Sequence, residues 1–322
     1  MLIASKINSF LKKVLLLILV AVIFVCGIDI FFNYTLRSAP WGLYNKFNTI
    51  IESNQKFNVW ILGSSRAETA FETNILSEKF QQTFFNAGIH GSKPQQTYYV
   101  FKHILSHHPL PQLVIMDVDI HNISDEDTIL NIEQFAPFLR HSQLRNDLSK
   151  IDKRIQWVYY NPLYEMSFWG LRGISKITRV LINQPGRYDT TFQTSGCYHS
   201  HTDFQKEHYP DTTHPFIFHP TNTQYLDSII FICRKNNISV LFSISPVFQP
   251  DSNIFNASKK LKAFCNRRNI ALIDCSNIPA LSFDKAKFSD KYHLKYNGSI
   301  VFTNIFTDTL KKYKFQKTFT KD

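Results

Sequence analysis

The stretch that decides the fold is Val59-Trp60-Ile61-Leu62-Gly63-Ser64-Ser65-Arg66-Ala67-Glu68. Its first four residues are apolar and favour a strand, the run breaks at Gly63, and a segment compatible with a helix follows. In an open parallel sheet, the turn after a strand lies at the carboxyl edge, where ligands bind beside the N–H groups of the next helix. A serine in this turn therefore has the position that a nucleophile needs.

Ser65 has a second interpretation that involves no chemistry. Ser65 and Glu68 fit the S-x-x-E capping box, in which the two side chains bind free backbone N–H groups at the start of a helix. Taken alone, the stretch favours this cap over a nucleophile. The rest of the chain has to decide between the two.

The composition indicates a globular and basic protein. Hydrophobic residues make up 44% of the chain and aromatic residues 15%, and the formal net charge is +11. A basic protein is attracted to anionic lipid head groups or to acidic polymers. The basic residues are scattered and form no recognition helix, so we expect no nucleic-acid partner.

The N-terminal segment predicts a membrane anchor. Lys6, Lys12 and Lys13 precede an apolar run from Val14 to Ile28 that continues past Asp29 and is long enough to cross a bilayer. The lysines place the N-terminus in the cytoplasm and the later residues outside it. A cleaved signal peptide is the alternative, but no small-x-small cleavage site follows the run. The predicted organisation is a cytoplasmic N-terminus (1–13), a transmembrane helix (14–33), a membrane-proximal linker (34–57) and one extracytoplasmic domain (58–322).

Strands and helices alternate through most of this domain. The predicted strands are residues 59–63, 83–86, 113–119, 240–244 and 270–274. Such alternation predicts a three-layer α/β/α, flavodoxin-like fold around a five-stranded parallel sheet. Residues from about 123 to 220 break the rhythm and are rich in aromatic residues, histidine and proline. We interpret them as an insertion over the carboxyl edge of the sheet that forms a lid or a substrate wall.

The histidines of the insertion raise the hypothesis of a metal site, but the spacing of cysteines and histidines does not favour it. Cys26 lies in the apolar run, and the other four cysteines either form disulfides or remain buried thiols: Cys197, Cys233, Cys265 and Cys275. No C-x-x-C spacing is present. The segment Cys197-Tyr198-His199-Ser200-His201 lacks a second pair of ligands, so we expect solvated loop histidines, no metal and no cofactor.

Near the C-terminus, Asp290 and His293 stand three residues apart at the start of a final amphipathic helix. A short turn can present both, with the carboxylate orienting the imidazole and the ring free to accept a proton from a serine. The alternative makes Asp290 a helix cap and His293 an exposed residue of the first turn. Together with Ser65 and the Gly-containing loop 86–91, the pair favours catalysis, because nucleophile, oxyanion donors and base then share one sheet edge.

This arrangement resembles the SGNH/GDSL hydrolase superfamily over residues of about 58–122 and 222–312, leaving the insertion uncovered. The resemblance implies that Ser65 is the nucleophile and that Ser64 replaces the usual aspartate of the first block. It also implies that Asn86-Ala87-Gly88-Ile89-His90-Gly91 is the second block, with Gly91 as an oxyanion donor. Asp290 and His293 then belong to the last block, Phe288-Ser289-Asp290-Lys291-Tyr292-His293-Leu294.

The third block of the superfamily should offer an asparagine after the third strand. Asn122 is the nearest candidate for this oxyanion donor, although His121-Asn122 lacks the usual Gly-x-Asn context. Within the superfamily, an N-terminal anchor combined with Gly-Ser-Ser is similar to an envelope group. This group includes the lipoteichoic-acid D-alanylation protein and relatives of alginate acetyltransferases.

The envelope resemblance implies an acyl donor, an acylated cell-envelope glycan or polymer, and a membrane-bound acyl-transfer partner. From the residues themselves we expect Ser65 to attack an ester or thioester carbonyl and His293 to accept its proton, while Asp290 stabilises the imidazolium. The N–H groups of Ser65 and Gly91 would hold the oxyanion. Hydrolysis and transfer share the acyl-serine intermediate, so esterase and acyltransferase both remain open. The hypothesis from another class is a catalytically inactive glycan-binding or scaffold component of the envelope.

Overall fold

The computed structural model describes residues 2–120, 129, 131–160, 164–186, 189–205 and 219–313. Five parallel strands form one sheet in the order β2-β1-β3-β4-β5. They are β1 (Val59–Leu62), β2 (Phe84–Asn86), β3 (Leu113–Asp117), β4 (Ser239–Ile244) and β5 (Ala271–Asp274). This is the strand order of flavodoxin-like, doubly wound folds. The predicted fold class is confirmed, and all five strands lie where the sequence places them.

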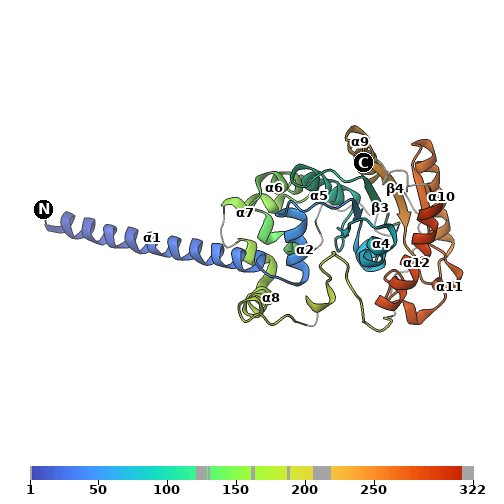
Figure 1. The fold of residues 1–322 in the computed structure, drawn as a ribbon. Helices are drawn as coiled ribbons and strands as arrows, with labels where there is room; N and C mark the ends of the chain where they lie inside the picture. The colour runs from blue at the N-terminus through green and yellow to red at the C-terminus, as the bar shows by residue number, and fades with distance from the viewer. Residues whose placement is uncertain are drawn as a thin grey trace.

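Helices cover both faces of the sheet because successive strand residues point to opposite sides. Trp60 and Leu62 belong to the core formed with α2 (Gly42–Ile51), α5 (Pro94–His107), α9 (Pro220–Lys235) and α10 (Ser252–Arg267). Val59 and Ile61 belong to the core formed with α3 (Ser65–Ala70), α4 (Thr73–Phe80), α11 (Pro279–Ser282) and α12 (Tyr296–Lys312). Figure 1 shows these helices gathered around the sheet at the end of the molecule that lies far from the N-terminus.

The start of α10 at Ser252 has a clear cause. The Asp251 carboxylate accepts the N–H groups of Asn253 and Ile254 and so caps the helix at that point.

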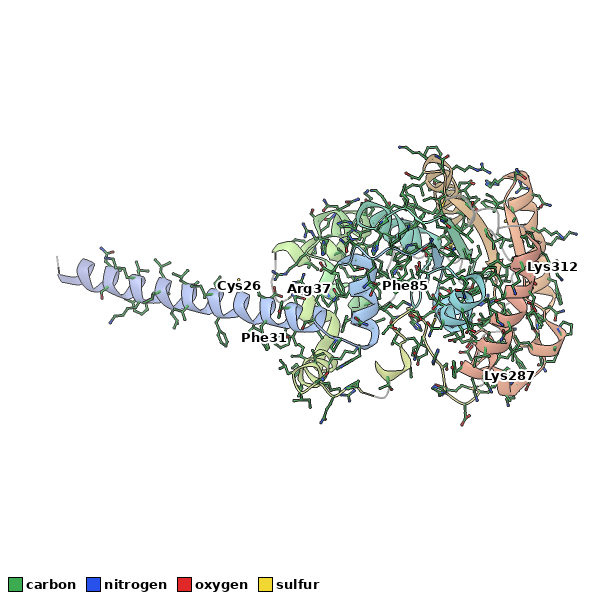
Figure 2. The ribbon with its side chains drawn as sticks, viewed as in Figure 1. Cys26, Phe31, Arg37, Phe85, Lys287 and Lys312 are labelled. Carbon is green, nitrogen blue, oxygen red and sulfur yellow. The ribbon has the colours of Figure 1, made fainter. Side chains whose placement is uncertain are left out.

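The helix α1 (Leu2–Arg37) projects from the domain as a single long rod (Figure 1). Its segment from Ile7 to Arg37 is long and apolar enough to cross a membrane. In Figure 2 its side chains extend into open space along most of the helix, whereas Arg37 lies within the domain. Asp29 is buried there and pairs with Arg140. The helix therefore enters the domain without a break.

Residues 34–57, which we expect to be a linker, hold the end of α1 and the helix α2. Phe47 and Ile50 of α2 are fully buried in the larger core. Lys46 is also buried, with its Nζ atom 2.8 Å from Glu68 Oε1 and 2.5 Å from the carbonyl oxygen of Gly88. One lysine thus joins α2 to the helix that follows Ser65 and to the loop that follows β2.

The described part of the insertion contains three further helices: α6 (Ser142–Leu148), α7 (Trp157–Tyr160) and α8 (Tyr164–Leu181). Short 3-10 helices accompany them and the C-terminal region: η1 (Ile132–Gln134), η2 (Ala136–Phe138), η3 (Lys153–Gln156), η4 (Asp189–Thr191) and η5 (Lys285–Lys287). The helices α7 and α8 lie on the side from which α1 emerges (Figure 1), and α8 packs against α1.

The end of the insertion returns to the carboxyl edge of the sheet. The backbone N–H of Asn86 donates to the carbonyl of Ser195, and the N–H of Tyr198 donates to the carbonyl of Glu68. The N–H of Gln205 donates to the carbonyl of Ser289. These bonds hold residues 195–205 against the end of β2, the helix α3 and the turn that contains Ser289.

Replacing Lys46 with methionine is expected to lower the free energy of unfolding by about 3–5 kcal/mol, because Glu68 is left as an uncompensated buried charge. Denaturant unfolding of the purified protein measures this loss. The control is Lys150→Met, which removes an exposed ammonium group but leaves the Asp147 carboxylate paired with Lys102, so it should cost less than about 1 kcal/mol. Equal losses of unfolding free energy in the two variants would show that the buried Lys46–Glu68 ion pair does not stabilise the fold more than an exposed lysine does.

Candidate active site

The helix α3 begins at Ser65, and the residue that caps it is Ser64. The Ser64 hydroxyl accepts the N–H of Arg66 at 3.2 Å and donates to Asp119 Oδ2 at 2.8 Å. The capping interpretation of Ser65 is therefore wrong, because its neighbour is the cap and Glu68 pairs with Lys46. The Ser65 hydroxyl is left for another partner.

That partner is His293. Ser65 Oγ lies 2.8 Å from His293 Nε2, and His293 Nδ1 lies 2.7 Å from Asp290 Oδ2. A proton on Nδ1 would donate to the carboxylate and leave Nε2 to accept the hydroxyl proton of the serine. His293 keeps about a fifth of its side chain exposed, at 23%, so the ring faces the pocket. The structure thus brings three residues from distant parts of the chain into one hydrogen-bonded series.

The turn that carries Asp290 and His293 is separate from the last helix. The sequence places the pair at the start of this helix, but α12 begins at Tyr296 and its N-cap is Lys295. Asp290 instead stabilises a separate turn, because its Oδ1 atom accepts the N–H groups of Tyr292 and His293 at 2.7 and 2.9 Å. The interpretation of Asp290 as a cap of the last helix is wrong. One carboxylate oxygen holds the turn, and the other holds the imidazole ring.

Asp290 is held in its charged form. Burial on its own would raise the pKa of this carboxyl group. The hydrogen bond and charge of His293, with the N–H groups of Tyr292 and His293, outweigh burial, so the net pKa lies below the ordinary value of 3.8. The carboxylate is therefore ionised at neutral pH and stabilises a positive charge on the neighbouring ring.

The loop after β2 forms a tight turn beside Ser65. The N–H of Ser92 donates to the carbonyl of Ile89 at 2.9 Å, and Gly91 has a φ of 69° at the third position of this turn. A type II turn requires positive φ at that position, which favours glycine. Gly91 lines the same pocket as Ser65, Asp290 and His293.

The pocket has a volume of about 390 Å³. Besides the triad-like series and Gly91, one wall comes from the end of the insertion: Tyr198, Ser200, Thr202 and Gln205. The sequence places the insertion over this edge but does not identify the contributing residues. They have no motif of their own and reach the pocket through backbone bonds to Glu68 and Ser289.

The third-block candidate Asn122, like His121, lies outside the described residues. The described part of this loop supplies Asp119, which accepts the Ser64 hydroxyl and lies 3.5 Å from the buried Arg66. Arg66 also donates to the carbonyl oxygens of Ser245 and Pro246 at 2.5 and 3.3 Å. The network ties together the carboxyl ends of β1, β3 and β4. Its signal in the sequence is the alternating Asp-x-Asp at the end of the third strand.

Asp117 is the first aspartate of this Asp-x-Asp segment, and its side chain is fully buried. Its two oxygens accept the hydroxyls of Ser243 and Ser245, both at 2.8 Å. Burial raises the pKa of Asp117 to about 6, although the Arg66 charge and the two serine hydroxyls act against it. Gly63 makes room for this strand end, because a Cβ atom there would lie 2.7 Å from the Asp117 carbonyl oxygen.

The cysteines form no disulfide in the described structure, and Cys197 and His199 have structural partners. All five cysteines are unpaired, and burial raises the pKa of three thiols to about 12: Cys233, Cys265 and Cys275. Cys197 Sγ lies 2.9 Å from Thr73 Oγ1, and His199 Nε2 lies 2.7 Å from Glu72 Oε2. Within the described part of the chain, no group of three His, Cys, Asp or Glu side chains is placed to hold a metal ion.

Comparisons with known proteins add little to this geometry. No family model and no curated protein matches the chain. The solved structure of the acetyl xylan esterase AlAXEase is 14% identical with a TM-score of 0.39, over 80% of this chain and 99% of that one. A GDSL-like lipase from Bacteroides thetaiotaomicron is 11% identical with a TM-score of 0.40, over 88% of this chain and 99% of that one. Similarities this low do not indicate an activity, so the activity has to be argued from the site.

Replacing Asp117 with asparagine is expected to change the pH dependence of stability. Because the folded pKa is raised from 3.8 to about 6, the native state binds the extra proton, and wild-type stability falls as pH rises between these values. Relative to the variant, the wild type should lose about 2 kcal/mol of unfolding free energy between about pH 4.5 and about pH 7. Denaturant unfolding at both pH values measures the difference. If the unfolding free energies of the two proteins change equally between the two pH values, Asp117 is ionised at both pH values.

Proposed function

We propose that the protein is an extracytoplasmic, membrane-anchored serine acyltransferase or esterase of the SGNH type. In this proposal it acts through an acyl-serine intermediate on O-acyl groups of a cell-envelope polysaccharide or polymer. The observation that carries the proposal is the series of hydrogen bonds from Asp290 through His293 to Ser65. A serine with an oriented base beside a pocket is the arrangement that nucleophilic acyl chemistry requires.

The first half-reaction follows from this geometry. Ser65 Oγ attacks the carbonyl carbon of the ester as its proton moves to His293 Nε2, which lies 2.8 Å away. The resulting tetrahedral intermediate collapses when the bond to the leaving alcohol breaks and His293 returns the proton to that oxygen. The product is an acyl-serine at Ser65, with Asp290 stabilising the transient imidazolium.

The negative charge of the tetrahedral intermediate needs N–H donors. Ser65 is the first residue of α3, so its backbone N–H is one of those that a helix leaves without an internal acceptor. Gly91 lies across the same pocket in a turn that leaves its backbone unshielded by a side chain. We assign the oxyanion hole to these two N–H groups.

The second half-reaction decides between an esterase and an acyltransferase. Water releases the acyl group as an acid, whereas a sugar hydroxyl takes it as a new ester, and His293 serves as the base in both cases. The long apolar helix α1 would hold the site at the membrane surface, next to a membrane-bound donor partner. We therefore favour an envelope polymer as the substrate and an acyl group delivered at the membrane.

A fluorophosphonate probe is expected to label the full-length wild-type protein at Ser65. Ser65→Ala should abolish labelling, and Asp290→Asn should slow it by about 10³-fold or more, because the imidazole loses its ionised partner. The matched control is Ser64→Ala, which removes the cap and the bond to Asp119 but leaves the nucleophile, so labelling should persist. Intact-protein mass spectrometry reads the adduct. A wild type that remains unlabelled would support the catalytically inactive envelope component instead.

The substrate class has its own test in cells. Envelope glycans from cells with wild-type protein and with Ser65→Ala should differ in their O-acyl content, because only the wild type can form the acyl-serine. Mass spectrometry of the released glycans gives the mass and position of the acyl group. A gain of acyl groups in the variant indicates an esterase, and a loss indicates a transferase. Identical glycans in both strains would contradict the proposed substrate.

A further inference from the structure

The part of α1 that stands clear of the domain is too short to cross a bilayer by itself. The predicted span begins at Val14, after Lys12 and Lys13, and burial of α1 by the domain begins after Phe24. At the rise of an α-helix, this stretch is about 16 Å long, whereas the hydrocarbon core of a bilayer is about 30 Å thick. With the lysines at the cytoplasmic surface, the core therefore reaches the part of α1 that runs along the domain.

That part of α1 has two different sides. Toward the domain, Asp29 is buried and pairs with Arg140. The α1 strip, which consists of Ile30, Phe31 and Tyr34, is exposed, and its positions fall on one face of a helix. Figure 2 shows Phe31 at the end of α1 that meets the domain. An apolar surface therefore continues along α1 at a level where its other side is already covered by protein.

The helix α8 carries a second exposed apolar surface. The α8 strip consists of Ile174, Leu181 and Ile182, which are 48%, 59% and 55% exposed. The N–H of Ile182 donates to the carbonyl of Thr178, so the helical pattern includes this residue. Positions 174, 181 and 182 share one face because seven or eight residues make about two helical turns. Ile177, by contrast, is buried against the domain.

Contacts with α1 and α2 hold α8 beside the base of the long helix. The helix α8 packs against α1, and Trp41 Nε1 donates to Asn183 Oδ1 at 3.3 Å. Lys176 Nζ lies 4.6 Å from the centre of the Tyr44 ring of α2. In Figure 1, α7 and α8 lie at the end of the domain from which α1 emerges, and Trp157 of α7 is exposed. Tryptophan is enriched where a protein meets the surface of a membrane.

The charges around the α8 strip suit an anionic lipid surface. Residues 173–186 contain two basic residues, Lys176 and Arg179, and no acidic one. An interfacial helix combines an apolar face, which enters the boundary between head groups and acyl chains, with basic residues that attract anionic head groups. A bilayer reaches the α8 strip without any further partner, because α1 already brings the lipid to this end of the domain.

We propose that the α8 strip lies in the extracytoplasmic interface of the bilayer that α1 spans. This inference rests on the membrane anchor of the proposed function and not on its acyl chemistry. The second contact fixes the tilt of the domain, because a single spanning helix is otherwise free to tilt and interfacial anchors set its angle. It also fixes the height of the catalytic pocket above the lipid, since α8 lines a cavity of about 520 Å³ that shares His90 with this pocket.

Quenching by spin-labelled lipid tests the contact in the full-length protein. Leu181→Cys is made in a Cys26→Ser background, in which the remaining native cysteines are buried, and is labelled with the fluorophore NBD. The protein is placed in nanodiscs of phosphatidylcholine and phosphatidylglycerol. Lipid with a doxyl group on carbon 5 should lower the emission at least about twofold, because the apolar face of an interfacial helix lies about 5–10 Å deep.

The matched control is Phe283→Cys, labelled in the same way. Phe283 is 58% exposed, against 59% for Leu181, and follows α11 at the end of the domain far from α1 (Figure 1). Its emission should not change with doxyl lipid. Equal quenching at the two positions would show that the dye itself enters the lipid, and it would overturn the assignment of the α8 strip. Ile174→Cys replaces Leu181→Cys if melting temperatures show that the latter does not fold.

A third position separates this inference from the anchor itself. Ile18→Cys, on the exposed part of α1, should be quenched by lipid with the doxyl group deeper in the chain. Quenching at Ile18 without quenching at Leu181 would overturn the interfacial contact and retain the anchor. No quenching at Ile18 would overturn both. Since no ester is turned over in this assay, its result does not depend on Ser65, and fluorophosphonate labelling tests the acyl chemistry separately.

Discussion

The hydrogen bond between the Ser65 hydroxyl and His293 Nε2 is the interaction on which the rest of the site depends. It joins residues that are 228 positions apart in the chain. The bond can form because Ser65 follows the carboxyl end of β1, an interior strand of the sheet, and because Ser64, not Ser65, caps the helix α3. With the cap provided by its neighbour, the Ser65 side chain turns to the imidazole. Asp290 then fixes that ring from the other side.

The fold and the main site residues are readable from the sequence because they follow local rules. Apolar runs followed by turns give the strands, and the parallel order brings their carboxyl ends to one edge. Ser65 stands at such a turn, whereas Asp290 and His293 stand in a short turn before the last helix. What local rules leave undecided is which serine caps the helix, because Ser64 and Ser65 are chemically identical candidates. That choice depends on Asp119, whose carboxylate comes from the loop after β3 and accepts the Ser64 hydroxyl.

Other residues of the site match no sequence motif, because their positions depend on packing between distant segments. Lys46 lies in a segment that looks like a linker, yet its ammonium group is buried against Glu68 and the carbonyl of Gly88. Gln134 lies in the insertion and holds the carbonyl of His90. These contacts link the loops of the site to α2 and to η1. The site is therefore supported from the side on which α1 enters the domain.

The most direct test of the account is rapid-mixing kinetics of the full-length protein with p-nitrophenyl acetate. The account predicts a burst of about one equivalent of nitrophenol per protein, provided that deacylation is the slower step. Acid-quenched protein should then carry one acetyl group on the peptide that contains Ser65. An acetyl group on any other residue, or turnover with no acetylated protein at any time point, would contradict an acyl-serine intermediate at this site.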